Sequence, residues 1–158
     1  MPRLLASAEA NTLEGDDELA MLVSTLVKTA QTHLKNQRGE FFPFAAFVNA
    51  GGMVEMLGAD TGDAQPKSTD MIELLRGALH SMASEGRIKG SGICVNVGAR
   101  LPGYGDKVDS ICCFIERASQ PPIDFYVPFR KGFLGYKYDK PVVLLGTTKV
   151  FPMPEGSA

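Results

Sequence analysis

The three cysteines are the first side chains in this sequence that could act as nucleophiles. Cys112 and Cys113 are adjacent, and Cys94 lies in an earlier apolar stretch. A catalytic thiol needs a lowered pKa, which a nearby histidine, a cation or a helix N-terminus supplies. Cys112 and Cys113 stand instead among Ile111 and Phe114, where burial would raise the pKa. We therefore interpret all three as reduced, inert core thiols, and no zinc-type cysteine spacing accompanies them.

His33 and His80 are the only histidines and could serve as general bases. Each falls in a segment with helical periodicity, and neither has a serine or cysteine partner at a recognisable catalytic spacing. We interpret both as surface or boundary residues. The sequence thus predicts no catalytic residue, which favours a protein that is not an enzyme.

Two loops have the composition of ligand-binding loops but not the pattern. Asp60, Asp63 and Asp70 surround a Gly- and Pro-containing loop that lacks the alternating register and final glutamate of a calcium loop. Residues 101–106, LPGYGD, are rich in glycine but lie between predicted strands and lack the Lys-Ser/Thr of a phosphate-binding loop. The sequence predicts no metal site and no cofactor.

A basic and aromatic segment near the C-terminus is the remaining candidate for a binding surface. Tyrosine and arginine are enriched where protein interfaces concentrate their binding energy, so we expect a protein partner or self-association. A surface loop whose aromatic side chains fold inward is the alternative. The candidate binding residues are Arg130, Lys131, Phe133, Tyr136, Lys137 and Tyr138.

Two amphipathic helices are the elements that would position these residues. Apolar residues spaced by three and four from Leu19 to Leu34 predict a helix that begins near Asp16 or Asp17 and ends at Gly39. A second apolar stripe predicts a helix over residues 70–85. There Asp70, with Glu73 three residues later, has the spacing of a capping box.

Apolar and alternating segments predict the strands of one sheet. Residues 44–50 and 53–59, joined by an Asn-Ala-Gly-Gly turn, predict an antiparallel hairpin. Three strands should follow over 93–100, 110–117 and 123–129, the last at an edge or at the end of its pairing at Pro128. Residues 142–145 and 147–151 could form one bent strand with a bulge at Gly146.

These elements predict an α+β domain with an antiparallel sheet of five or six strands and two main helices, in the order α-β-β-α-β-β-β(-β). Two apolar helix stripes need a sheet surface that buries them. A ferredoxin-like arrangement is the alternative, although it has a different strand count. We expect a flexible lead-in over residues 1–15, one domain over 16–151 and a frayed tail over 152–158.

Composition limits the class of protein. At 158 residues, with 44% hydrophobic and 22% charged residues, the chain has the make-up of a globular domain. The net charge of −2 and the absence of a basic stripe argue against a nucleic-acid partner. No apolar run approaches the roughly 20 residues that span a bilayer, and the N-terminus lacks a signal-type apolar segment. We expect a cytoplasmic protein with no membrane partner.

Two resemblances follow from these residues. The element order over residues 17–130 resembles the roadblock and profilin-like domains, which implies a five-stranded sheet between helices. The segments GEFFPFAAFVNAGG (39–52), KSTD (67–70) and IDFYVPFRKGFLG (123–135) resemble a small bacterial single-domain family of unknown function. That second resemblance covers most of the chain and implies no activity.

The sequence therefore favours a non-catalytic module that acts by protein association, as a homodimer or an accessory protein. A small enzyme or ligand-binding protein is the alternative. Its pocket would lie between the sheet and the loops that carry Tyr104 or Tyr136.

Overall fold

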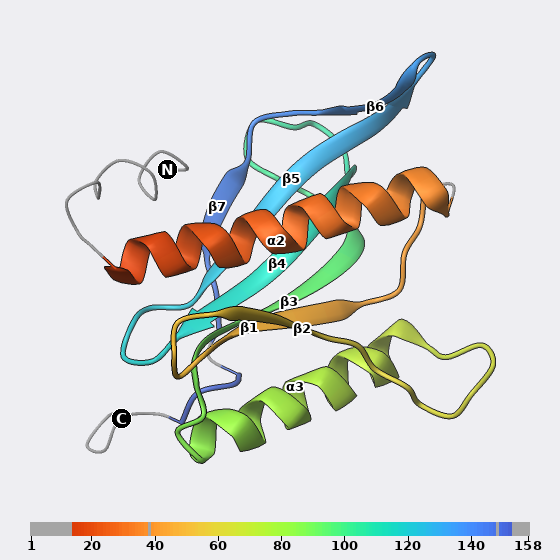
Figure 1. The fold of residues 1–158 in the computed structure, drawn as a ribbon. Coiled ribbons are helices and arrows are strands. Elements are labelled where there is room, and N and C mark those ends of the chain that lie inside the picture. The colour runs from red at the N-terminus through yellow and green to blue at the C-terminus, as the bar shows by residue number, and fades with distance from the viewer. Residues whose placement is uncertain (1–13, 38, 148, 153–158) are drawn as a thin grey trace.

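A computed structural model describes residues 14–37, 39–147 and 149–152 of the chain (Figure 1). It consists of two helices and a seven-stranded sheet. In chain order the elements are α2 (Glu14–Asn36), β1 (Phe44–Asn49), β2 (Val54–Leu57), α3 (Ser68–Ser84), β3 (Ile88–Ala99), β4 (Val108–Arg117), β5 (Ile123–Gly132), β6 (Gly135–Tyr138) and β7 (Val142–Leu145). This order confirms the predicted α+β class.

All pairings in the sheet are antiparallel, and the strands follow one another in the order β2-β1-β3-β4-β5-β6. β7 pairs with the first half of β5, and β6 pairs with its second half. The two short strands thus share the same side of β5. The seven-stranded sheet and its leading helix differ from the β-α-β-β-α-β order of a ferredoxin-like domain.

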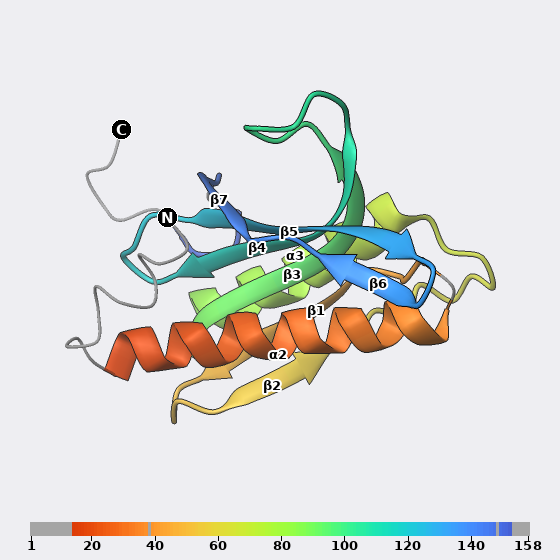
Figure 2. The same cartoon turned by 90° about the horizontal axis from the view of Figure 1, so that it is seen from above.

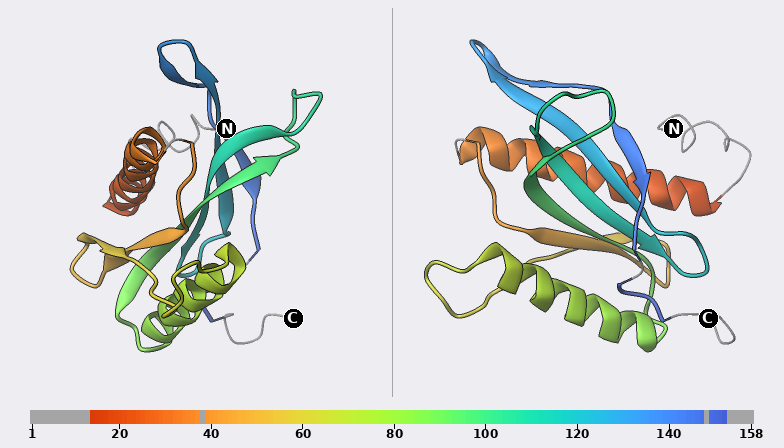
Figure 3. Two further views of the ribbon diagram at one scale, coloured as in Figure 1. Left: turned by 90° about the vertical axis from the view of Figure 1, so that its right-hand side faces the viewer. Right: turned by 180° about the vertical axis from the view of Figure 1, so that it is seen from behind.

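Each face of the sheet is covered by one helix, so the molecule has three layers (Figure 3). Buried residues of α2 pack with one set of inward-facing strand residues, which includes Phe44, Ile111 and Val127. Buried residues of α3 pack on the other face with Ala45, Ile93 and Cys112. Successive strand residues point to opposite faces, which is why neighbours such as Phe44 and Ala45 belong to different cores.

The predicted hairpin at residues 44–59 is confirmed, and Asn49 organises its turn. The Asn49 side-chain oxygen accepts hydrogen bonds from the backbone N–H groups of Gly51 (2.9 Å) and Met53 (3.0 Å). Gly52 has a φ of 88°, a conformation that side chains other than glycine rarely adopt. The turn is therefore fixed by local sequence.

The predicted capping box at the start of α3 is wrong. The helix begins two residues before Asp70, at Ser68, and Lys67 occupies the cap position without a side-chain hydrogen bond. Asp70 lies inside the first turn instead. There its negative charge interacts favourably with the positive end of the helix dipole.

The C-terminal part of the sheet differs most from the prediction. β6 was not predicted as a strand. Residue 147 and residues 149–151 are not in a strand, because the chain leaves the sheet after β7, and residue 148 lies outside the described residues. At Gly146 an added Cβ would lie 2.7 Å from the Asp124 carboxylate and 3.2 Å from the Ile123 backbone. Gly146 thus lies where the chain passes close to Ile123 and Asp124 of β5, and not at the bulge that the sequence predicted. Pro128 is the last β5 residue paired with β4. The sequence offered an edge position or the end of pairing at this proline, and the structure shows the end of its pairing with β4.

The domain boundaries can be compared with the sequence only in part. Residues 14 and 15 already belong to α2, and the rest of the expected lead-in and nearly all of the tail over 152–158 lie outside the described residues. Within the described ranges, neither helix is both long and apolar enough to cross a membrane.

Candidate functional site

The predicted binding segment forms the hairpin of β5 and β6, which we call the β5–β6 hairpin (residues 129–138). Its strands pair from Phe129 opposite Tyr138 to Gly132 opposite Gly135, which leaves Phe133 and Leu134 as a two-residue loop. The hairpin projects from the body of the sheet (Figure 1) and runs beside the C-terminal part of α2 (Figure 2). The six predicted residues are therefore brought together on one element.

The two faces of the β5–β6 hairpin carry different chemistry. Residues directly opposite each other in a ladder share a face. Phe129 and Tyr138 contact each other on the α2 side with ring centroids 6.2 Å apart, and Tyr136 meets Phe129 edge-on at 5.8 Å. Arg130 and Lys137 lie opposite each other on the other face and are exposed. The alternative of inward-folded aromatics thus holds for Tyr136 and Tyr138.

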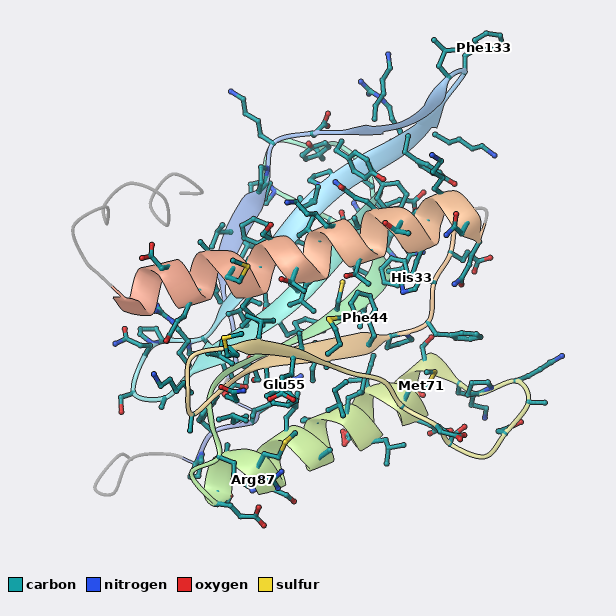
Figure 4. The ribbon with its side chains drawn as sticks, in the orientation of Figure 1. His33, Phe44, Glu55, Met71, Arg87 and Phe133 are labelled. Atoms are coloured by element: carbon teal, nitrogen blue, oxygen red, sulfur yellow. The ribbon has the colours of Figure 1, made fainter. Side chains whose placement is uncertain are left out.

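Phe133 and Leu134 at the hairpin tip are the most exposed large apolar side chains among the described residues. Phe133 is 100% exposed and Leu134 is 93% exposed. Figure 4 shows Phe133 at the far end of the hairpin, pointing away from the body. Adjacent exposed apolar residues on a projecting element carry no packing role in the monomer, so the tip is the clearest candidate for a contact surface.

A groove separates the C-terminal half of α2 from the hairpin. It encloses about 670 Å³ and is lined on the helix side by Lys28, Gln31, Thr32 and Lys35, and on the hairpin side by residues that include Lys131, Leu134 and Tyr136. Sequence reasoning missed the helix side of this site. Lys28 and Lys35 are seven residues apart on one helix, a spacing that places both on one face and could have pointed to it.

The groove continues toward the N-terminal end of α2, where its lining becomes apolar. This second stretch encloses about 480 Å³ and shares Gln31 and Tyr138 with the first. Helix residues line one wall, and the sheet with the start of the β6–β7 connection lines the other. The members are Leu19, Ala20, Val23, Ser24, Val27, Phe125, Val127, Asp139 and Pro141.

The three cysteines are buried, as the sequence indicates, and they are free thiols. Cys94 and Cys113 face each other across β3 and β4, with their sulfur atoms 3.8 Å apart. Burial raises the pKa of Cys94, and the Cys113 thiol raises it further. Burial also raises the pKa of Cys112. None of these features activates a nucleophile.

We expect the native protein to react negligibly with the thiol reagent DTNB at pH 8, because all three thiols are buried and inaccessible. In denaturant all three should react at once. A Leu145→Cys variant is the control, since residue 145 is exposed and its thiol should react in the folded protein. Rapid reaction of a native thiol before unfolding would contradict the assignment of these cysteines to the core.

Both histidines have structural partners. The His33 ring lies edge-on to Phe44 with centroids 5.4 Å apart and close to Phe41 at 6.3 Å (Figure 4). His80 uses Nδ1 to donate a hydrogen bond of 2.7 Å to the backbone carbonyl of Val150. The described contacts of the two rings include no cysteine and no carboxylate.

A small cavity lies between α3 and the sheet, on the face opposite the groove. It encloses about 90 Å³, and its charged lining includes Arg76, Asp124 and Lys149. Burial raises the pKa of Asp124, and the nearby Lys149 ammonium partly offsets this. Pockets for small molecules usually enclose about 300 Å³ or more, so this space suits a few water molecules better than a metabolite. It is lined by neither Tyr104 nor Tyr136, and of these two tyrosines Tyr136 lines the groove beside α2 instead.

A buried carboxylate on the α3 face fastens the C-terminal segment to the sheet. Glu116 is only 7% exposed. Its oxygens accept backbone hydrogen bonds from Lys149 (2.6 Å), Val150 (2.8 Å) and Phe151 (3.2 Å). Three N–H donors satisfy a buried carboxylate. The role of Glu116 is therefore structural, and it explains why residues 149–151 do not continue the sheet.

The chain matches no protein-family model, no curated protein and no solved structure. Among the described residues, no group of three or more His, Cys, Asp and Glu side chains has the arrangement of a metal site. A functional site is therefore supported by the geometry of the β5–β6 hairpin and of the adjoining groove.

Proposed function

We propose that this chain is a cytoplasmic, non-catalytic association module that forms a homodimer through its β5–β6 hairpin. The observation that carries the proposal is the tip, where Phe133 and Leu134 project fully into solvent. The cytoplasmic assignment is supported by three free, buried thiols.

The surroundings of the tip favour a protein surface as its target. Burying a side chain such as Phe or Leu stabilises a complex by about 1.5–3 kcal/mol, and aromatic anchors concentrate binding energy. Arg130, Lys131 and Lys137 form a charged base around the tip. An apolar centre with a polar rim is the usual anatomy of an interface.

Removing the apolar tip should abolish self-association without unfolding the protein. We expect Phe133→Ser combined with Leu134→Ser to convert the dimer to a monomer, because the variant lacks the apolar side chains of the contact. The fold should persist, because both side chains are exposed in the isolated chain. Light scattering after size exclusion measures the mass. Thermal unfolding at low protein concentration, where the wild type is also monomeric, should give similar midpoints for both proteins.

Met53→Ser is the matched control, since Met53 is 67% exposed in the turn between β1 and β2, far from the hairpin. This variant should remain dimeric. A tip variant that dimerises as tightly as the wild type would rule out the hairpin as the contact.

A further inference from the structure

The surface beside the hairpin suggests where the tip of a second copy binds. The groove along α2 has an apolar stretch of about 480 Å³ whose walls include Val23, Val27 and Phe125. It lies on the same side of the sheet as the inward-folded tyrosines of the β5–β6 hairpin. An apolar loop and an open apolar groove thus occupy neighbouring positions on one face, as a self-complementary surface requires.

Charges along this groove are divided between its two ends. In the apolar stretch the charged lining residue is Asp139, whose carboxylate also accepts a hydrogen bond of 2.8 Å from the Tyr104 hydroxyl. At the opposite end the lining carries Lys28, Lys35 and Lys131. Two copies related by a two-fold axis, with their α2 helices antiparallel, would bring the basic stretch of each copy toward Asp139 of the other.

We infer that two chains form a reciprocal dimer in which the Phe133–Leu134 tip of each copy enters the apolar groove of the other. This inference rests on the proposed self-association and names its surfaces. The basic hairpin, with Arg130 and Lys131 behind the tip, approaches Asp139 in the apolar stretch of the partner groove. The apolar tip leaves water and covers what remains exposed of the apolar groove walls.

A second copy of the chain provides a binding partner for both the apolar tip and the apolar groove. Every chain carries a tip and a groove, so a two-fold dimer satisfies both at once and closes without leaving either exposed. The net charge of −2 per chain gives little overall repulsion between copies.

Ala20→Glu tests the groove without disturbing the core. Ala20 is an exposed residue of α2 that lines the groove, so glutamate is tolerated by the helix but places a charge where the tip should bind. We expect dimer dissociation to become easier by on the order of tenfold or more. Met21→Glu is the control, because Met21 is the exposed next residue of the same helix, outside the groove lining. It should dimerise like the wild type.

Mixing the two defective proteins tests reciprocity. Ala20→Glu retains an intact tip, and the Phe133→Ser, Leu134→Ser variant retains an intact groove. A heterodimer of the two has one native contact, so it should form more tightly than either variant dimerises alone and less tightly than the wild type. Native mass spectrometry of the mixture counts the heterodimer directly.

The possible outcomes separate the inference from the proposed function. If Ala20→Glu dimerises normally while the tip variant is monomeric, the groove assignment is wrong and hairpin-mediated self-association stands. If both variants are monomeric but their mixture gives no heterodimer, reciprocal docking is wrong. If the wild type itself is monomeric at all concentrations, both the inference and the proposed function are overturned.

Discussion

Glu116→Ala is expected to lower the free energy of unfolding by about 3 kcal/mol. The substitution removes the acceptor of three backbone hydrogen bonds, from residues 149, 150 and 151, and hydrogen bonds to a charged group are individually worth about 1.5–3 kcal/mol. The contributions do not add fully, because the segment can detach and its N–H groups can then bind water. The loss is thereby limited to the free energy of docking residues 149–151, which includes the burial of Val150 and Phe151.

Denaturant unfolding of this variant measures the loss, and Glu40→Ala is the control, since Glu40 is exposed. Hydrogen exchange adds a local readout, because the amides of Val150 and Phe151 should lose protection before the sheet does. Glu116→Gln should give an intermediate loss. Its carbonyl oxygen can keep the two bonds made to Oε1, while its NH₂ group faces the Phe151 N–H. A stability equal to that of the Glu40 control would show that Glu116 does not hold the segment.

Gly92→Ala is expected to destabilise the fold by about 1–3 kcal/mol, although alanine is normally a better strand residue than glycine. A Cβ at this position would overlap Cδ1 of Leu26 and lie 2.8 Å from Cδ1 of Ile115. Leu26 is fully buried on the inner face of α2, so in a close-packed core it can move only by displacing its neighbours. The helix and the sheet would have to separate locally. Chemical denaturation against the wild type gives the size of the effect.

A double-mutant cycle with Leu26→Ala isolates this contact. Leu26→Ala alone should cost about 2–5 kcal/mol through loss of a buried side chain. In that background the added methyl group of Gly92→Ala meets mainly Ile115, so its cost should fall sharply or vanish. Gly98→Ala is the matched control in the same strand, since an added Cβ there meets nothing within 4 Å. An additive double mutant would contradict close packing of α2 on Gly92.

The helices could be predicted from the sequence because their signal is local. The apolar stripe from Leu19 to Leu34 reports which face of α2 is buried, and the residues at those positions are buried in the fold. The start of β3 could not be predicted in the same way. Lys89 to Gly92 contains two glycines and a serine, which are poor strand formers, yet the segment pairs with both β1 and β4. Gly92 is required there by contact with α2, which is a tertiary effect.

The candidate site shows the same division between local and long-range information. Charge and aromatic content identified the segment from Arg130 to Tyr138, and the hairpin brings its residues together. The sequence did not reveal which of them are exposed. That distinction depends on Phe129, against which Tyr136 and Tyr138 pack, and on the two-residue loop that leaves Phe133 and Leu134 outside. The groove could not be predicted, because its walls come from α2 and from strands about 100 residues later.

Glu116 illustrates a role that composition alone does not suggest. In the sequence it is the charged end of an apolar strand, with nothing to distinguish it from a solvent-facing residue. In the fold it lies beneath residues 149–151, more than 30 positions away, and accepts their backbone hydrogen bonds. Of the bent strand predicted over residues 142–145 and 147–151, the first part forms as β7, and residues 149–151 do not continue it for the same reason. The N–H groups of these three residues bind a carboxylate and not a neighbouring strand.

Sedimentation equilibrium of the wild-type protein over a wide concentration range tests the claim of self-association most directly. The account predicts a concentration-dependent mass that rises from the 17.0 kDa of one chain to twice that value and then levels off. A plateau at the dimer is expected because a two-fold interface closes on itself. A single species of one-chain mass up to the highest attainable concentration would contradict the account.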